Sequence, residues 1–260
     1  MVLQLEDLQW GDVLADTGEV LVLEALLDED KVIVKRWGGT ALDAELTVRR
    51  LLDAAGVAQP QLLGGGAGWL VVEDLAETMW RPAGPADLTD PATVRALARW
   101  FTRVHEVEPA GLPRAEWELN DLVEVLADLV PPDLAGPLAQ RLSEWSELVE
   151  QAPRCVVLGS LEASGVAVVG AGMQAMATDL SLAHGGIREE DLTVVRSRLE
   201  PAAWLAFEAE YRDVSGTPID PRLWAAQLGI GEVFALLAEV LHGRMPGPER
   251  LQALRDAVAG

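Results

Sequence analysis

The stretch VVLGSLEASGVAVVGAGMQAMATD, residues 156–179, decides the fold of this chain. An apolar run, Val166–Val169, leads into Gly170–Gly172, and a second apolar run ends at Asp179. Two structures fit this order. One is the glycine-rich turn of a dinucleotide-binding domain, which has the pattern G-x-G-x-x-A. The other is a hairpin turn between two strands.

The dinucleotide-binding alternative needs a helix after the glycines and a later strand that carries an acid. Acids do follow about twenty residues on, at Glu189-Glu190-Asp191. However, Gly185-Gly186 would interrupt a helix, and the roughly 75 residues beyond are mostly helical in pattern, too few for a doubly wound sheet. We therefore expect a hairpin turn at Gly170–Gly172 and no NAD.

Composition is typical of a folded protein. Of 260 residues, 50% are hydrophobic and 24% are charged. No apolar run reaches the roughly 18 residues of a membrane-spanning helix. The first ten residues lack the basic-then-apolar order of a secretory signal. A single cysteine, Cys155, excludes an internal disulfide. These features predict a cytoplasmic protein.

The charge of the chain bears on its partners. The formal net charge is −22, from 42 acids and 20 bases, and only Lys31 and Lys35 are lysines. A surface this acidic repels nucleic-acid phosphates and anionic lipids, so we expect neither a nucleic acid nor a membrane as partner. It would attract a cationic small molecule, but we favour a generally acidic surface as the explanation of the charge.

The first 75 residues have a β-rich pattern. Val20–Leu27 and Lys31–Arg36 are apolar and β-branched, and the acids Asp28-Glu29-Asp30 between them predict a hairpin. Thr40 can cap a helix that runs to about Ala55 and stops at a glycine. The sequence GGGAG, before a strand at residues 69–73, predicts another turn.

After residue 80 the pattern becomes mainly helical. Asp90-Pro91 begins a helix that runs through Val107. A second β region, residues 155–179, interrupts the helices. The further helices that the apolar spacing predicts are Leu119–Leu129, Leu134–Gln151, Pro201–Tyr211 and Pro221–Leu241.

Six segments together carry a family resemblance. They are VIVKRW (Val32–Trp37) with Glu45 ten residues after its lysine, GWLVVEDL (Gly68–Leu75), LARWFTRVHEV (Leu97–Val107), VVLGSLEASGVAVV (Val156–Val169), MATDLSLAHGG (Met176–Gly186) and FEAEYRDVSGTPIDPRLW (Phe207–Trp224). In order and spacing they resemble the aminoglycoside phosphotransferase and choline-kinase-like family, whose fold is similar to that of protein kinases. The resemblance covers nearly the whole chain.

The resemblance implies an α+β, bilobal protein-kinase-like fold. Its small antiparallel N-lobe would comprise residues 1–75. Its larger helical C-lobe would comprise residues 76–260 and contain the β insert 155–179. The resemblance also implies ATP and Mg²⁺ as cofactors, because this family transfers a phosphoryl group.

Site residues are implied in the same way. Lys35, held by Glu45, would bind the phosphates of ATP. Asp179, at the end of an apolar strand, stands where the family places a metal-binding aspartate. The backbone from Glu73 to Leu75 would form the hinge between the lobes and hold adenine.

The chain departs from the family at the catalytic loop. The family pattern resembles H-G-D-L-x-x-x-N, whereas this chain has Leu158 for the His, Ser160 for the catalytic Asp and Gly165 for the metal-binding Asn. A serine hydroxyl is not a ready general base at neutral pH, and glycine offers no side-chain oxygen to a metal. The turn that would cover the phosphates has one glycine, Gly18. We therefore expect a non-catalytic binding or regulatory protein, with weak or absent nucleotide binding that Mg²⁺ helps little.

An active enzyme is the alternative. In an extended segment, Glu162 faces the same side as Ser160 and could replace the missing base. The protein would then be an ATP-dependent phosphotransferase acting on a small-molecule alcohol. His105 is expected to have a structural role at a helix end. His184 has no assigned role, and the sequence does not name a small-molecule or protein partner.

Overall fold

The computed structural model describes the chain apart from residues 1, 2, 4, 17, 19, 38–40, 114–121, 124, 127, 171 and 260. The chain forms two compact units. The first comprises Met1–Arg114 and Arg154–Gly216, and the second comprises Ala115–Pro153 and Thr217–Gly260. The division at residue 75, which the sequence predicts, stays a prediction.

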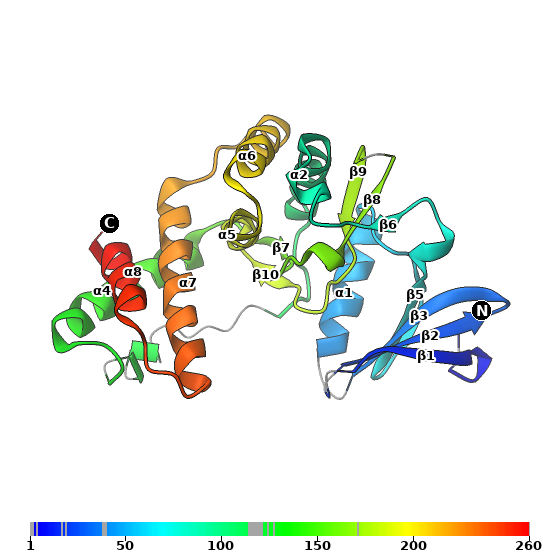
Figure 1. The fold of residues 1–260 in the computed structure, drawn as a ribbon, viewed down its shortest axis with the longest axis horizontal. Coiled ribbons are helices and arrows are strands. Elements are labelled where there is room, and N and C mark those ends of the chain that lie inside the picture. Colours follow the sequence, from blue (N-terminus) through cyan, green and yellow to red (C-terminus); the bar gives the residue numbers. More distant parts are fainter. Residues whose placement is uncertain are drawn as a thin grey trace. The chain divides into compact units, whose positions relative to one another are not determined.

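The first unit contains a five-stranded antiparallel sheet in the order β1-β2-β3-β5-β4, drawn in blue and cyan in Figure 1. A short 3-10 helix, η1 (Leu5–Asp7), precedes it, and the helix α1 (Ala41–Ala54) connects β3 to β4. This is the antiparallel sheet with one helix that the sequence predicts. The strands are β1 (Gln9–Asp16), β2 (Val20–Leu27), β3 (Asp30–Trp37), β4 (Leu62–Gly66) and β5 (Trp69–Glu73).

The predicted hairpin between β2 and β3 is confirmed. Leu27 pairs with Asp30, so the loop is the dipeptide Asp28-Glu29. Both loop residues have positive φ, 50° and 78°, as the tight hairpin turns that match the twist of the strands require. The N-cap expected at Thr40 lies outside the described residues. The expected stop after α1 is present, since Gly56 has φ 64°.

The structure corrects the prediction of a turn at the glycine run before β5. Gly64, Gly65 and Gly66 belong to strand β4, and the turn is Ala67-Gly68, where Gly68 has φ 76°. A Cβ on Gly64 would lie 2.7 Å from the side chain of Leu3, and one on Gly65 would lie 2.6 Å from that of Leu46. The glycines therefore let two leucines pack closely against the strand.

The rest of the first unit is mixed. Helix α2 begins with Asp90 as its N-cap and Pro91 in its first turn, as predicted, and it packs against α6 and β9. The remaining elements are η2 (Leu75–Glu77), β6 (Arg81–Pro82), η3 (Asp87–Thr89), α2 (Pro91–His105), β7 (Cys155–Val157), η4 (Ala163–Gly165), β8 (Val166–Val169), β9 (Gln174–Ala177), β10 (His184–Gly186), α5 (Arg188–Arg198) and α6 (Pro201–Ser215).

The question raised by Gly170–Gly172 is answered by the pairing of the flanking strands. β8 and β9 are antiparallel neighbours, and Val169 pairs with Gln174. The glycines therefore connect two strands of one hairpin, as predicted. Gly172 lies against the start of α2, because a Cβ on it would approach Thr93 Oγ1 to 2.3 Å. Helix α5, by contrast, has no counterpart among the predicted helices.

The second unit is helical. Its described helices are α4 (Pro132–Gln151), α7 (Pro221–Leu241) and α8 (Pro248–Ala259), and α8 is absent from the sequence-based prediction. In the predicted helix Leu119–Leu129, residues 122, 123, 125 and 126 are helical, and residues 119–121, 124 and 127 lie outside the described residues. Trp145 of α4 packs against α7 at Gly229, where a Cβ would lie 2.3 Å from the indole ring.

Helix α7 corrects a second expectation. Among the described residues it is the one helix that is long and apolar enough to cross a membrane, although the sequence analysis found no such run. The buried core helix of an ordinary globular protein passes the same test, and 39% of the apolar window in α7 is buried. Leu236 and Val233 of α7 belong to the core that this helix shares with α4 and α8.

Candidate functional site

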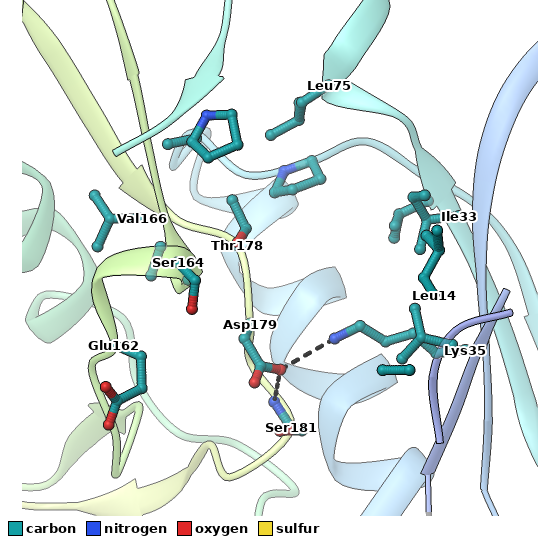
Figure 2. A pocket seen from close by; sticks show the side chains of 18 of the residues that line it. Leu14, Ile33, Lys35, Leu75, Glu162, Ser164, Val166, Thr178, Asp179 and Ser181 are labelled. Carbon is teal, nitrogen blue, oxygen red and sulfur yellow. Dashed lines mark hydrogen bonds and ion pairs between the residues drawn. The ribbon is translucent and has the colours of Figure 1, made fainter. Parts of the chain in front are cut away.

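A cavity of about 700 Å³ lies in the first unit, between the five-stranded sheet and the β8–β9 hairpin. Its apolar wall includes Val22 and Ile33 from the sheet and Val166 and Ala177 from the hairpin. Residues 73–76, the predicted hinge, also line it. Figure 2 shows Ile33 and Leu75 above Lys35 and Asp179, so one part of the cavity is apolar and the other is charged.

Lys35 and Glu45 meet in the charged part of the cavity. Lys35 lies on the central strand β3, opposite Val22 and Leu70 of its neighbours, and points its Nζ toward α1. The Nζ donates to Glu45 Oε1 over 3.1 Å. Glu45 is fully buried. The two residues thus form the ion pair that the spacing suggests, while its role in binding phosphates stays a prediction.

Asp179 is the second partner of this lysine. Its Oδ1 accepts from Lys35 Nζ at 3.0 Å and from the backbone N–H of Ser181 at 3.2 Å (Figure 2). Burial alone would raise the pKa of Asp179, but the charge and hydrogen bond of Lys35 outweigh it and hold this pKa below its ordinary value. Asp179 is therefore an ionised carboxylate at neutral pH, which is the form that binds a metal.

Gly165 lies beside Asp179 but contributes no ligand atom. A Cβ built on Gly165 would stand 3.8 Å from Asp179 Cβ, which is an ordinary contact distance. Its carbonyl accepts from the N–H of Thr178 at 2.8 Å. The position next to the aspartate is thus occupied by backbone alone. Among the described residues, no group of three or more His, Cys, Asp and Glu side chains is arranged to hold a metal.

The loop that contains Ser160 is fixed by a residue that sequence reasoning did not assign to the site. Asp191, at the start of α5, accepts from the N–H of Leu158 at 2.9 Å and from that of Gly159 at 3.0 Å. Its Oδ2 lies 3.1 Å from Nε2 of His105, whose Nδ1 lies 2.8 Å from the hydroxyl of Tyr211. His105 thus has a structural role, but through contacts with Tyr211 and Asp191 rather than through the helix-end interaction that the sequence predicts.

The sequence held only a weak signal for Asp191. It stands in a run of three acids, which the dinucleotide alternative also required. Its burial, with 1% of the residue exposed, is what distinguishes it from an ordinary acid in the first turn of a helix. Ser160 lines the cavity, and Leu158 is buried beneath it.

Glu162, the candidate substitute base, lines the cavity, but its ion-pair partner lies outside the cavity. It forms an ion pair with Arg198 at the end of α5, and 62% of its side chain is exposed. His184 likewise is paired. Its Nδ1 lies 3.0 Å from the carbonyl of Leu182 and its Nε2 lies 2.8 Å from Glu190 Oε2. This histidine therefore joins β10 to the first turn of α5.

The turn between β1 and β2 borders the cavity through Leu14, Ala15 and Val20. Within it, the N–H of Gly18 donates to Asp16 Oδ1 at 2.8 Å. The Gly18 N–H is a backbone donor of the kind that could bind a phosphate oxygen, but here it binds the Asp16 carboxylate. The Asp16 carboxylate also brings a negative charge to this turn. Residues 17 and 19 lie outside the described part of the turn.

These features can be tested against ATP and Mg²⁺. The apolar wall and the hinge suit a flat heteroaromatic ring, and Lys35 is a suitable partner for one phosphate. For Mg²⁺, which needs several oxygen ligands, the site presents the Asp179 carboxylate beside Gly165. Binding of a base in the apolar part and of a metal in the charged part stays a prediction, and Gly165 offers a metal no side-chain oxygen.

Comparisons with known proteins place the fold. No protein-family model matches the sequence, and no curated protein matches it. Solved structures do match over nearly the whole chain. The choline kinase LicA from Streptococcus pneumoniae has a TM-score of 0.64 at 14% identity, with 96% of this chain and 94% of that chain covered.

Two further structures agree. A spectinomycin phosphotransferase in complex with ADP and its antibiotic has a TM-score of 0.61 at 12% identity, covering 97% of this chain and 91% of that one. An ethanolamine kinase from Plasmodium vivax has a TM-score of 0.63 at 11% identity, covering 98% and 83%. LicA has also been solved in complex with AMP.

The chain thus has a kinase-like fold, of the kind found in aminoglycoside and macrolide phosphotransferases and in choline and ethanolamine kinases. This confirms the predicted fold class. At these identities the likeness concerns the fold, and activity has to be argued from the site itself.

Proposed function

We propose that this protein is a non-catalytic relative of the aminoglycoside phosphotransferases, in which the cavity serves binding or regulation. One observation carries the proposal. Asp191 holds the backbone of the loop on which Ser160 lies, where the resemblance would put the catalytic base, and Gly165 next to Asp179 has no side chain. The groups that would accept a proton and complete a metal site are therefore both missing.

ATP, when bound with Mg²⁺, supplies the phosphoryl group and the charge neutralisation for transfer in this fold. The chain's own residues offer Lys35 and Asp179 for that purpose. We propose that ATP binds weakly or not at all, with little help from Mg²⁺. Millimolar ATP with Mg²⁺ should shift the melting temperature by less than about 2 °C. A larger shift that Asp179→Ala abolishes would contradict this part of the proposal.

The test of the missing groups is to restore them. The wild type should transfer no phosphate above background to aminoglycosides, choline-like amino alcohols or sugar alcohols. Ser160→Asp with Gly165→Asn puts back both side chains, and the 3.8 Å approach at Gly165 leaves room for the second. ATP turnover should rise by about 10²-fold or more, since a positioned base contributes about that much.

A matched control shows whether any gain comes from the site. Adding Asp179→Ala to the restored variant should return turnover to background, because the remaining carboxylate ligand is lost. If the restored variant stays silent although it is folded and binds ATP, the missing side chains are not what prevents catalysis. The proposal would then lose its support.

An active enzyme with a migrated base is the second candidate. Its support is the contact of Lys35 with both Glu45 and Asp179, which is the arrangement a working phosphate site needs. In that case Glu162 would accept the proton of a small-molecule alcohol. Arg198→Met would then increase turnover by freeing Glu162, and Glu162→Gln would remove it, while Ser160→Ala would have little effect.

The partners and the location are part of the proposal. A small molecule or a protein that fits the cavity is the expected partner. The net charge of −22 supports the exclusion of nucleic acids and anionic membranes. We propose a cytoplasmic location, and the single buried cysteine agrees with a reducing compartment.

A further inference from the structure

A second cation lies behind the Lys35–Glu45 pair. Arg49 follows Glu45 by one turn of α1, and its side chain is fully buried. Its Nε and Nη2 donate to Glu45 Oε1 at 3.0 Å and 2.6 Å. Glu45 Oε1 thus accepts from Arg49 and from Lys35 at once.

The Arg49 guanidinium also contacts backbone groups outside α1. Its Nη2 also donates to the carbonyl of Thr178 at 3.2 Å, and its Nη1 lies 3.5 Å from the carbonyl of Pro60. Thr178 immediately precedes Asp179, and Pro60 precedes β4. Arg49 therefore connects α1 to the segment that carries Asp179, 129 residues farther along the chain.

Burial makes this cation unusual. An ionised group inside a protein is costly unless it is paired and hydrogen-bonded, so Arg49 and Glu45 depend on each other. Glu45 Oε2 has no hydrogen-bond partner among the described groups, which leaves Oε1 to hold both cations. A guanidinium suits this position, because its planar fork can donate to a carboxylate and a carbonyl together.

We propose that Arg49 is an internal latch that holds α1 against the Asp179 segment, so that Lys35, Glu45 and Asp179 stay in contact without a bound nucleotide or metal. The latch supplies from within the chain a positive charge that neutralises the buried carboxylate. The proposal is independent of whether the protein transfers phosphate, since it concerns how the unliganded site is held.

Amide hydrogen exchange of the full chain tests the latch. We compare wild type with Arg49→Met, Arg49→Lys and the control Arg50→Met, whose arginine is the exposed neighbour on the same helix. In Arg49→Met, exchange should rise by about tenfold in α1 and in residues 177–181, but not in β2 or β3. Arg50→Met should match wild type in all these segments.

Arg49→Lys keeps a positive charge beside Glu45 but removes the hydrogen bond to the Thr178 carbonyl. It also keeps the test decisive if Arg49→Met does not fold. A lysine can neutralise Glu45 but cannot also reach Thr178 in the same geometry. Protection of α1 should then stay near wild type while residues 177–181 exchange several-fold faster. Equal exchange of residues 177–181 in Arg49→Lys and wild type would overturn the proposal.

The two lysines give a second readout that a general loss of stability would not produce. In Arg49→Lys, acylation of Lys35, measured by mass spectrometry relative to Lys31, should increase several-fold as the contact with Asp179 loosens.

Discussion

The two walls of the cavity differ in the groups they present. On the sheet side, Lys35 touches Glu45 and Asp179, and Arg49 stands behind them. On the loop side, residues 160–165 line the cavity with the hydroxyls of Ser160 and Ser164, the Glu162 carboxylate that pairs with Arg198, and the backbone of Gly165. The charged groups and the groups expected to transfer protons lie on different elements. The charged groups can therefore keep their geometry when the proton-transfer groups are absent.

The support of the two walls also differs. The sheet side is held by charged side chains that meet inside the protein. The loop side is held by backbone N–H groups that donate to one carboxylate, Asp191. The position of the loop therefore depends on Asp191, whereas each charged residue behind the sheet depends on the others.

The largest expected loss of stability comes from removing a charged residue on the sheet side of the cavity. Glu45→Ala would leave Arg49 buried without its carboxylate, so the free energy of unfolding should fall by about 3–5 kcal/mol. Urea denaturation measures the loss. The control is Glu24→Ala, whose partner Lys31 is partly exposed and whose pair should contribute about 0–1 kcal/mol. Similar losses in both variants would contradict the interdependence of the buried charges.

The hairpin that leads to Asp179 gives the next effect. A Cβ on Gly172 would meet Thr93 Oγ1 at 2.3 Å, and the residue has φ 82°. Gly172→Ala should therefore lower the free energy of unfolding by about 2–4 kcal/mol. Gly18→Ala, with φ 81° and no atom within 4 Å of the added Cβ, is the matched control and should cost about 1 kcal/mol.

The loop side should respond to the loss of Asp191. In Asp191→Ala the N–H groups of Leu158 and Gly159 lose their acceptor, and the expected cost is about 2–3 kcal/mol. Hydrogen exchange at residues 158–160 should increase, while β3 and α1 remain protected. Unchanged exchange in the loop would show that another group holds it.

The smallest effect concerns pH. Burial would lower the pKa of His184, but its hydrogen bond to Glu190, the carbonyl of Leu182 and the charges of Glu190 and Asp191 raise it above 6.5. A raised pKa means that this stabilisation is fully present below about pH 6.5 and is lost as the pH rises through the folded-state value. The contribution should be under about 1 kcal/mol.

Denaturation curves at pH 6 and pH 8 measure the effect of His184. In His184→Gln the loss of stability between these two values should disappear. Asp191 is close to the same histidine, so the comparison has to be made with Asp191 intact. A wild-type stability that rises over this range would contradict the sign.

Much of the sheet side could be predicted from the sequence. Apolar β-branched runs with a short acidic loop predict a hairpin, and the loop Asp28-Glu29 is where the structure has it. Lys35 and Glu45 are close in the chain, so a strand and the next helix bring them together. On the loop side, the roles assigned to Ser160 and Gly165 rest on their spacing before Asp179 in the sequence, and they stay predictions.

Other elements were missed for physical reasons. Helix α5 reads REEDLTVVRSR, and its many charges hide the short apolar face that packs inward. Gly64–Gly66 looked like a turn, but side chains from elsewhere lie so close to β4 that no Cβ fits. Helix α7 was predicted with its observed bounds, Pro221–Leu241, but its apolar length was underestimated because single polar residues divide the apolar sequence.

By itself, the sequence determined the features that depend on neighbouring residues: hairpin loops, helix caps, the period of apolar positions and the residue types along the catalytic loop. Tertiary structure alone decided that Arg49 contacts Thr178 and that Asp191 holds the backbone of the Ser160 loop. These partners lie 129 and about 30 residues apart. Such contacts depend on how whole helices and strands pack. A local sequence pattern does not indicate which other helix or strand its residues will contact.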